Sequence, residues 1–193
     1  NDDKFIEDAI KENWVKPAIS NYGSRTYTFS EVAAEIYKWH LFFDKCGIKK
    51  GDHITICSRN SAEWCIAFLA ITSYEAIAVP LLADFFPENI ANLVKVSDSR
   101  MLFVDKAVLS GLQRSGVAGN FGEYENFIGV FDIVTYEGIE DCNNSINVKV
   151  EDIDAAFSKK YPGGMGVADV HFSCGALDDL SVISYTSGTS SSP

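Results

Sequence analysis

Residues 181–193 read S-V-I-S-Y-T-S-G-T-S-S-S-P, an apolar run followed by a hydroxyl-rich turn. The β-branched and aromatic residues at 182–185 predict a strand. Backbone N–H groups in the turn can converge on an anion, the hydroxyls can donate further hydrogen bonds, and Gly188 lets the main chain approach closely. The stretch therefore predicts a strand that leads into a phosphate-binding loop.

Composition alone leaves a second interpretation of this stretch open. Clusters of Ser, Thr, Gly and Pro are common in surface loops, and serine-rich chain ends are commonly frayed. A Walker phosphate loop is disfavoured, because Gly188 is the only glycine in the turn and no Gly-Lys-Ser/Thr follows it.

The composition predicts a globular chain. Its 193 residues are 47% hydrophobic and 12% aromatic, enough for one domain, or one domain and part of another. A net charge of −11 argues against nucleic acid binding. No apolar run is long enough to cross a bilayer, so no transmembrane segment is expected. Five scattered cysteines without C-x-x-C spacing favour reduced thiols in a cytoplasmic protein, and neither they nor the three histidines predict a metal site.

Apolar runs and helical periodicities alternate along the chain. Strands are expected at residues 53–57, 76–82, 101–104, 127–134 and 181–185. Helices are expected before Pro17, after Thr28, at 64–71, from Pro87, from Asp105 to about 112, and near 153–157. A small hairpin is expected at 18–21 and 25–28. This alternation predicts an α/β layered domain with a mainly parallel sheet flanked by helices.

Several local signals fix where the helices start. Thr28 with Glu31 and Asn60 with Glu63 each have the spacing of a capping box, and Asp105 can cap the helix that follows it. Pro80 near the end of its strand suggests that pairing stops there. Three glycines in seven positions predict that residues 116–122 loop out.

The order of residues in the final stretch is more informative than their composition. The run Tyr185-Thr186-Ser187-Gly188-Thr189, followed by Ser190, Ser191, Ser192 and Pro193, resembles the phosphate-binding signature of AMP-forming adenylating enzymes. In this acyl-CoA synthetase and luciferase superfamily the usual run is Tyr-Thr-Ser-Gly-Thr-Thr-Gly-x-Pro-Lys-Gly. Ser190 replaces the second Thr and keeps a hydroxyl, whereas Ser191 replaces the second Gly.

Further segments resemble the same superfamily in the same order. Gly47-Ile48-Lys49-Lys50-Gly51-Asp52, followed by a strand and then Asn60, is similar to its Gly-x-x-x-Gly-Asp turn, strand and helix start. Residues 78–81 are similar to its Val-Pro-Leu strand. Glu75 departs from the pattern, because it stands where those enzymes usually have Gly, and it suggests a different local turn or an exposed helix end.

The resemblance implies that residues 1–193 are the N-terminal portion of an AMP-binding (adenylation) domain, cut within or at the edge of its phosphate-binding loop. The stretch Asp84-Phe85-Phe86-Pro87 and the long segment between Val104 and Ser181 look most like long-chain fatty-acid–CoA ligases. Such enzymes activate a fatty acid with ATP and Mg²⁺ and transfer the acyl group to coenzyme A. Peripheral membrane association of a full-length enzyme is left open.

By position, the resemblance assigns phosphate contact to Thr186, Ser187, Gly188, Thr189, Ser190 and Ser191. It places the catalytic lysines, the acidic magnesium ligand and the acyl pocket beyond Pro193, so no catalytic or metal residue is assigned here and the isolated fragment is expected to be inactive. Two alternatives stay open. One is another adenylating branch, such as an aryl-CoA ligase or a peptide-synthetase adenylation domain, and the other is a non-catalytic α/β binding module with a serine-rich linker.

Overall fold

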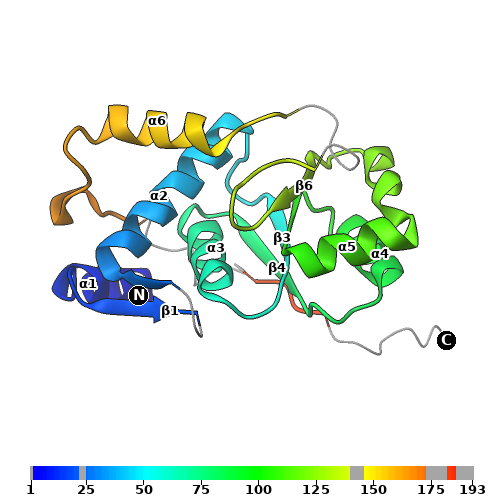
Figure 1. The fold of residues 1–193 in the computed structure, drawn as a ribbon, viewed down its shortest axis with the longest axis horizontal. Coiled ribbons are helices and arrows are strands. Elements are labelled where there is room, and N and C mark those ends of the chain that lie inside the picture. The colour runs from blue at the N-terminus through cyan, green and yellow to red at the C-terminus, as the bar shows by residue number, and fades with distance from the viewer. Residues whose placement is uncertain (1, 22–24, 140–145, 173–181, 186–193) are drawn as a thin grey trace.

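The structure is a computed structural model that describes residues 2–21, 25–139, 146–172 and 182–185 (Figure 1). Its centre is a four-stranded parallel sheet with the strand order β4-β3-β5-β6. The strands are β3 (His53–Cys57), β4 (Ile77–Leu81), β5 (Met101–Val104) and β6 (Gly129–Asp132). The predicted α/β fold with a mainly parallel sheet is confirmed, and β3 and β5 have the predicted bounds.

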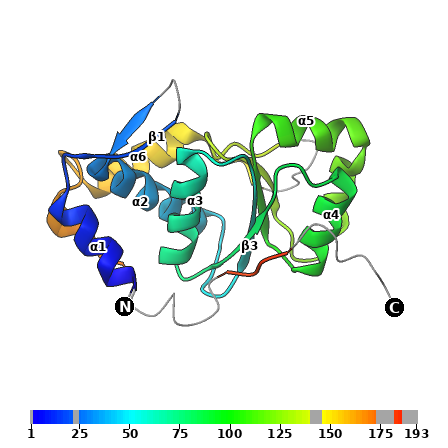
Figure 2. The same cartoon turned by 90° about the horizontal axis from the view of Figure 1, so that it is seen from below.

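Helices connect each strand to the next one in the sequence. α3 (Ala62–Ser73) joins β3 to β4, and α4 (Pro87–Val96) joins β4 to β5. α5 (Lys106–Ser115) and the 3₁₀ helix η1 (Val117–Glu123) join β5 to β6. Parallel strands need such crossovers because a tight turn cannot join them. Figure 2 shows α3 on one side of the sheet and α4 and α5 on the other, so the domain has three layers.

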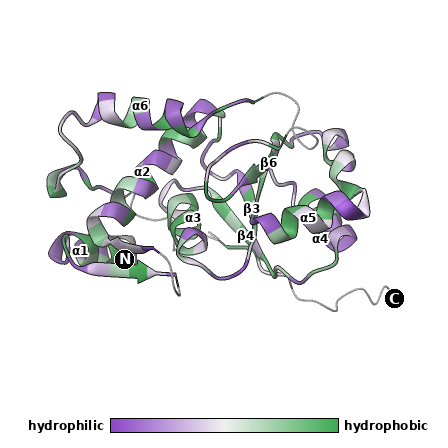
Figure 3. Cartoon of the chain, in the orientation of Figure 1, coloured by the Kyte–Doolittle hydropathy of each residue, from purple (hydrophilic) through white to green (hydrophobic). Residues whose placement is uncertain are grey.

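Strand β5 supplies side chains to both faces of the sheet. Met101 and Phe103 pack in the cluster that contains α2 (Phe29–Lys45) and α3, whereas Leu102 and Val104 pack in the cluster that contains α4 and α5. Successive strand residues point to opposite faces, so a strand covered on both sides must be apolar throughout. In Figure 3 the strands at the centre are accordingly hydrophobic, while the helices around them carry both kinds of residue.

The residues before β3 form a layer of helices and a hairpin. α1 (Asp2–Glu12) precedes the antiparallel pair β1 (Pro17–Ser20) and β2 (Thr26–Thr28), and α2 follows directly. α6 (Val150–Lys160) lies along α2 in Figure 1, and the 3₁₀ helix η3 (Val167–Asp169) comes after it. The predicted first helix and hairpin are confirmed, and the helix predicted near 153–157 is longer at both ends.

Helix α2 begins at the predicted capping box and attaches this layer to the sheet. The Glu31 N–H donates to Thr28 Oγ1 at 3.2 Å, and the Thr28 N–H donates to Glu31 Oε1 at 3.1 Å. Farther along, Trp39 is buried with its ring centroid 4.5 Å from that of Phe103 in β5. Aromatic side chains bury large areas, so this contact is a major attachment between helix and sheet.

The predicted capping box at Asn60 and Glu63 is wrong. Ser61 is the N-cap of α3, and its hydroxyl accepts the Trp64 N–H at 3.0 Å. The Glu63 carboxylate instead accepts hydrogen bonds from Asn21 and Tyr27 in the hairpin. A contact across more than thirty residues of sequence therefore overrides the local spacing.

The prediction that residues 116–122 loop out is also wrong. Residues 117–123 form η1, and Val117, Ala118 and Phe121 are buried against α4 and α5. Gly116 has φ +76° and ends α5 in the left-handed conformation that glycine adopts without strain. Gly116 thus marks the change of direction between α5 and η1, which pack in the same cluster.

Pro80 ends pairing on one side of β4 only. On the inner side it lies within the register, opposite Ile56 of β3. On the outer side Ala78 forms a parallel bridge with Val182, and the Ile183 N–H donates to the Ala78 carbonyl at 2.9 Å. The next bond of a parallel ladder would need an N–H at residue 80, which proline lacks. The predicted strand at 181–185 is therefore a single bridge in the part of it that the structure describes.

Glu75 lies just after the end of α3 with φ +67°, the left-handed region. Its carbonyl accepts the Gly51 N–H at 2.9 Å, and its side chain pairs with the largely exposed Lys50. A left-handed residue with a Cβ costs about 1 to 2 kcal/mol, whereas an exposed ion pair contributes about 0 to 1 kcal/mol.

We predict that Glu75→Gly raises the free energy of unfolding by about 0.5 to 1 kcal/mol, measured by urea denaturation, because glycine removes the strain but adds unfolded-state entropy. The control Glu75→Gln loses the ion pair and keeps the strain, so it should not stabilise the protein. A lower unfolding free energy for Glu75→Gly would contradict the assignment of strain.

His40 packs between the rings of Tyr37 and Tyr74, with centroid distances of 5.4 and 5.3 Å. Its Nε2 lies 3.0 Å from the Ala70 carbonyl oxygen and 3.0 Å from Ser73 Oγ. Burial lowers the pKa of His40 to about 4. Because this value lies below the ordinary pKa of about 6.5, the stabilising contribution is complete above pH 6.5 and is lost as the pH falls toward 4.

We predict that lowering the pH from 7 to 5 costs about 2 kcal/mol of unfolding free energy through His40. His40→Gln should remove this loss, because glutamine can still donate to Ala70 and does not titrate. The measurement is urea denaturation at both pH values, with His171→Gln as the control at an exposed histidine. An unchanged acid slope in His40→Gln would show that the pKa of His40 is the same in the folded and unfolded states, and would contradict the prediction.

Candidate functional site

A cavity of about 560 Å³ lies where the loops after β3 and β4 meet the segment that follows Val182. Its walls come from three parts of the chain that are far apart in sequence. In parallel sheets ligands bind beyond the carboxyl ends of the strands, and β3 and β4 both end at this cavity. The lining residues are Ser58, Arg59, Asn60, Trp64, Pro80, Leu81, Leu82, Ala83, Asp84, Ser184 and Tyr185.

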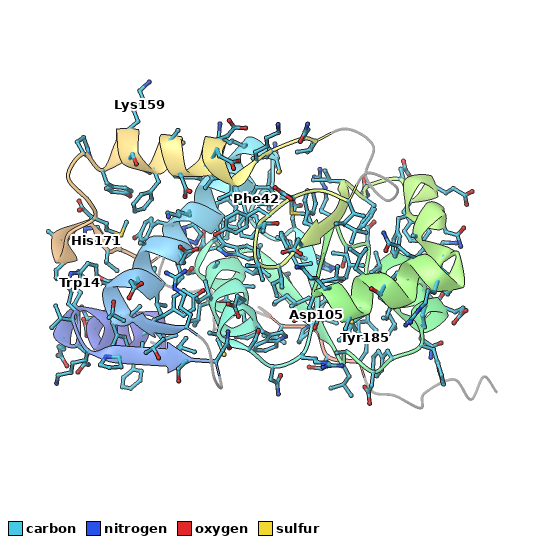
Figure 4. The ribbon with its side chains drawn as sticks, viewed as in Figure 1. Trp14, Phe42, Asp105, Lys159, His171 and Tyr185 are labelled. Atoms are coloured by element: carbon cyan, nitrogen blue, oxygen red, sulfur yellow. The ribbon has the colours of Figure 1, made fainter. Side chains whose placement is uncertain are left out.

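The last described segment reaches the cavity by running alongside β4. The parallel bridge at Ala78 gives this segment the direction of β4, so it points toward the carboxyl edge of the sheet. Ile183 and Tyr185 pack against the cluster formed with α4 and α5. In Figure 4 Tyr185 lies in the same part of the molecule as Asp105, while Trp14 and His171 lie at the opposite end.

The predicted phosphate-contact residues Thr186, Ser187, Gly188, Thr189, Ser190 and Ser191 lie outside the described residues. The structure does describe the residue to which they are attached, Tyr185, in the wall of the cavity. The position of their contacts therefore stays a prediction.

Asp105 fixes the loop after β3. One carboxylate oxygen accepts the Val108 N–H at 2.8 Å and caps α5, as the sequence predicts. The other accepts the Arg59 N–H at 2.9 Å and the Ser58 hydroxyl at 3.3 Å. Sequence reasoning missed this second role, because nothing in the local pattern shows that the ends of β3 and β5 are neighbours.

The cavity is lined by residues of both charges and by two aromatic residues, Trp64 and Tyr185. The Arg59 guanidinium has no hydrogen bond or ion pair with any other residue in the described ranges. Asp84 also lines the cavity. Trp64 stacks on Phe68 with a centroid distance of 5.4 Å and an interplanar angle of 7°. Arg59 is thus the group in this cavity that can pair with an anion, and its guanidinium geometry suits phosphate.

Cys57 at the end of β3 does not supply a nucleophile. It is fully buried, and burial raises the pKa of its thiol to about 12. Since the thiolate is the reactive form, this thiol is inert at neutral pH. Its Sγ lies 3.5 Å from the Leu82 carbonyl oxygen, where it can donate a weak hydrogen bond.

Across residues 2–21, 25–139, 146–172 and 182–185, no three His, Cys, Asp or Glu side chains are grouped so that they could hold a metal ion. No helix within these ranges is long and apolar enough to span a membrane.

Solved structures with this fold include two ligases, the anthranilate CoA ligase AuaEII and the coronafacic acid ligase of Pectobacterium brasiliense. The anthranilate CoA ligase AuaEII, solved in complex with anthranoyl-AMP, superposes with a TM-score of 0.57 at 21% identity, over 66% of this chain and 24% of its own. The fold is thus that of the N-terminal domain of adenylating enzymes. The model of the AMP-binding enzyme family matches residues 6–193, and the chain belongs to this family.

Several curated relatives match most of the chain, and two of them are CoA-forming enzymes by name. The acetyl-coenzyme A synthetase of Shewanella amazonensis is 27% identical over 88% of this chain and 26% of its own length. Long-chain-fatty-acid–CoA ligase 6 of Mus musculus is 25% identical over 86% of this chain and 23% of its own length. The chain thus spans about a quarter of the length of these two enzymes.

We predict that Asp105→Ala lowers the free energy of unfolding by about 2 to 3 kcal/mol, because it removes a helix cap and two further hydrogen bonds to a carboxylate. Asp105→Asn should lose about half as much, since it keeps one acceptor oxygen. Urea denaturation of both variants checks the order. The bonds that Asp105 accepts from Ser58 and Arg59 brace the loop after β3. Equal stability of Asp105→Ala and the unmodified protein would show that this brace contributes nothing.

Proposed function

We propose that residues 1–193 are the N-terminal portion of the adenylation domain of an ATP-dependent, AMP-forming fatty-acid–CoA ligase, and that the chain continues beyond Pro193. The observation that carries the proposal is the placement of Tyr185. It lies in the wall of a cavity at the carboxyl ends of β3 and β4, and the predicted phosphate loop follows it directly. Membership of the AMP-binding enzyme family supports the same reaction class.

The proposed reaction has two steps. The carboxylate oxygen attacks the α-phosphorus of ATP, giving acyl-adenylate and pyrophosphate. The thiol of coenzyme A then attacks the acyl carbon and displaces AMP. The first step brings an anion toward a triphosphate, so neutral donors and positive charge are needed to hold the phosphates and to stabilise the charge on the leaving pyrophosphate.

In this proposal the loop after Tyr185 binds the phosphates. Thr186, Ser187, Gly188 and Thr189 contact the phosphate oxygens through hydroxyls and backbone N–H groups, with Ser190 and Ser191 extending the loop. Arg59 adds positive charge from the opposite loop of the cavity. Losing the hydrogen bonds of one such hydroxyl should cost about 1 to 3 kcal/mol.

The family resemblance also implies Mg²⁺, which when bound would neutralise part of the triphosphate charge. The described residues do not form a ligand group for it. No role toward the metal is therefore assigned to any of them.

The proposed acid is a long-chain fatty acid. The phenylalanine-rich stretch 84–87 and the long segment between β5 and the final bridge support this choice, as does the similarity to the long-chain ligase of Mus musculus. The similarity to acetyl-coenzyme A synthetase makes a short acid the comparison to test.

The proposed location is the cytoplasm. Cysteines without C-x-x-C spacing support a cytoplasmic protein.

We predict that the full-length protein catalyses ATP–pyrophosphate exchange that depends on a long-chain fatty acid. The assay compares a chain-length series from acetate upward with a few aromatic acids and amino acids. Thr189→Ala should lower the exchange rate by about tenfold or more, because one phosphate contact is lost. Ser192→Ala, in the same serine run but outside the assigned residues, is the matched control and should retain the full rate.

Each result separates one part of the proposal from the rest. Exchange with aromatic or amino acids alone would keep the adenylation step and replace the fatty acid with another substrate class. A folded, full-length protein that shows no exchange with any carboxylate would overturn the ligase proposal.

A further inference from the structure

The hairpin formed by β1 and β2 lies outside the cavity, but its side chains hold the start of α3. The Ala62 N–H donates to Asn21 Oδ1 at 2.7 Å. The Asn21 amide donates from Nδ2 to Glu63 Oε2 at 2.8 Å. The Tyr27 hydroxyl donates to the other oxygen, Oε1 of Glu63, at 3.3 Å. One amide side chain therefore bonds both the backbone and a side chain of the first helical turn.

These bonds act on the segment that lines the cavity. Residues 58–60 form part of its wall, and Trp64 forms another part. Between them lie Ser61, which caps the helix, and Ala62, which is bonded to Asn21. At the other end of this loop the Arg59 N–H is bonded to Asp105. The loop is thus fixed at both ends, by Asp105 on one side and by Asn21 on the other.

The three groups are partly buried, which makes their bonds worth more than exposed ones. Asn21, Tyr27 and Glu63 each lie in partly buried contacts, and Tyr27 is 5% exposed. Arg25 lies over the Tyr27 ring at 4.2 Å from its centroid and pairs with Glu31 at the start of α2. The hairpin is therefore held against α2. Its hydrogen bonds to Ala62 and Glu63 in turn fix the start of α3.

We infer that Asn21 and Glu63 form a clamp that positions the loop at residues 58–61, and with it the guanidinium of Arg59, against the cavity. Asn21 and Glu63 are positioning residues, because neither lines the cavity. The effect on activity rests on the proposed function, whereas the effect on the loop does not.

In the clamp Asn21 donates a hydrogen bond and Glu63 accepts it, so the two roles can be exchanged by substitution. In Asn21→Asp a carboxylate faces that of Glu63, so the donor is lost and like charges meet. Adding Glu63→Gln returns a donor from the opposite side, while the new carboxylate still accepts the Ala62 N–H. Glu63→Gln alone provides a milder loss if Asn21→Asp fails to fold, because the Ala62 bond is kept. Asn126→Asp, which faces Asp98 at the other edge of the sheet, is the matched control.

Two readouts are taken on the full-length protein. Hydrogen exchange measured by mass spectrometry on peptides spanning residues 58–66 should be faster in Asn21→Asp, return to the original rate in the double variant, and be unchanged in Asn126→Asp. The kcat/KM for ATP in pyrophosphate exchange should fall about tenfold and recover to within about twofold in the double variant, because misplacing a contact group is costly.

The hydrogen-exchange result decides the clamp even if the protein has no ligase activity. Unchanged protection of residues 58–66 in Asn21→Asp, or a double variant that stays as fast as the single one, would overturn the inference. Faster hydrogen exchange spread evenly over the whole domain would also overturn it, since that would show a general loss of stability. Restored protection together with absent pyrophosphate exchange would keep the clamp and remove the proposed function.

Discussion

The parallel pairing of β3 on both of its edges is the constraint on which the fold depends. β3 bonds β4 on one side and β5 on the other, and the side chains of residues 54–57 are fully buried. Its one buried hydroxyl, on Thr55, lies 2.6 Å from the Ser99 hydroxyl. A slip of one residue would move Thr55 to the opposite face and break this bond, so the register is fixed. Because of that register, β3 and β4 end side by side, and the cavity lies where the two strands end.

Asp105 explains why the cavity lies toward β4. The order β4-β3-β5-β6 reverses direction between β3 and β5, and in open sheets this is the usual place for a ligand. Here the Asp105 carboxylate fills that position with bonds to Ser58, Arg59 and Val108. An anionic ligand would be repelled there. On the β4 side, by contrast, Arg59 lines the cavity together with Ser184 and Tyr185 of the last described segment.

The sequence predicts the sheet better than the contacts between its parts. Apolar runs locate β3 and β5 because a strand buried on both faces is a nearly continuous run of apolar residues. The spacing of Thr28 and Glu31 locates the start of α2 because both partners are local. The same reasoning fails at Asn60 and Glu63, because Ser61 is an equally good cap and the hairpin takes the carboxylate.

Predictions about the site divide in the same way. The prediction that a strand at 181–185 leads into a binding loop depends on the apolar run at 182–185, which is a local signal. The brace from Asp105 and the clamp from Asn21 join residues more than forty positions apart, and no local pattern encodes them. The phosphate contacts of residues 186–191 lie outside the described residues and remain predictions.

Pro80 also governs what can associate with the outer edge of β4. Exposed strand edges are templates for pairing with other molecules, and proteins commonly protect them. After Ala78, which the Val182 bridge already occupies, the next outward-facing residue of β4 is Pro80. An incoming strand finds no N–H donor there, so it cannot extend a regular ladder along this edge. Pro80, which lies next to the single bridge between Ala78 and Val182, thereby also guards this edge of β4 against edge-to-edge aggregation.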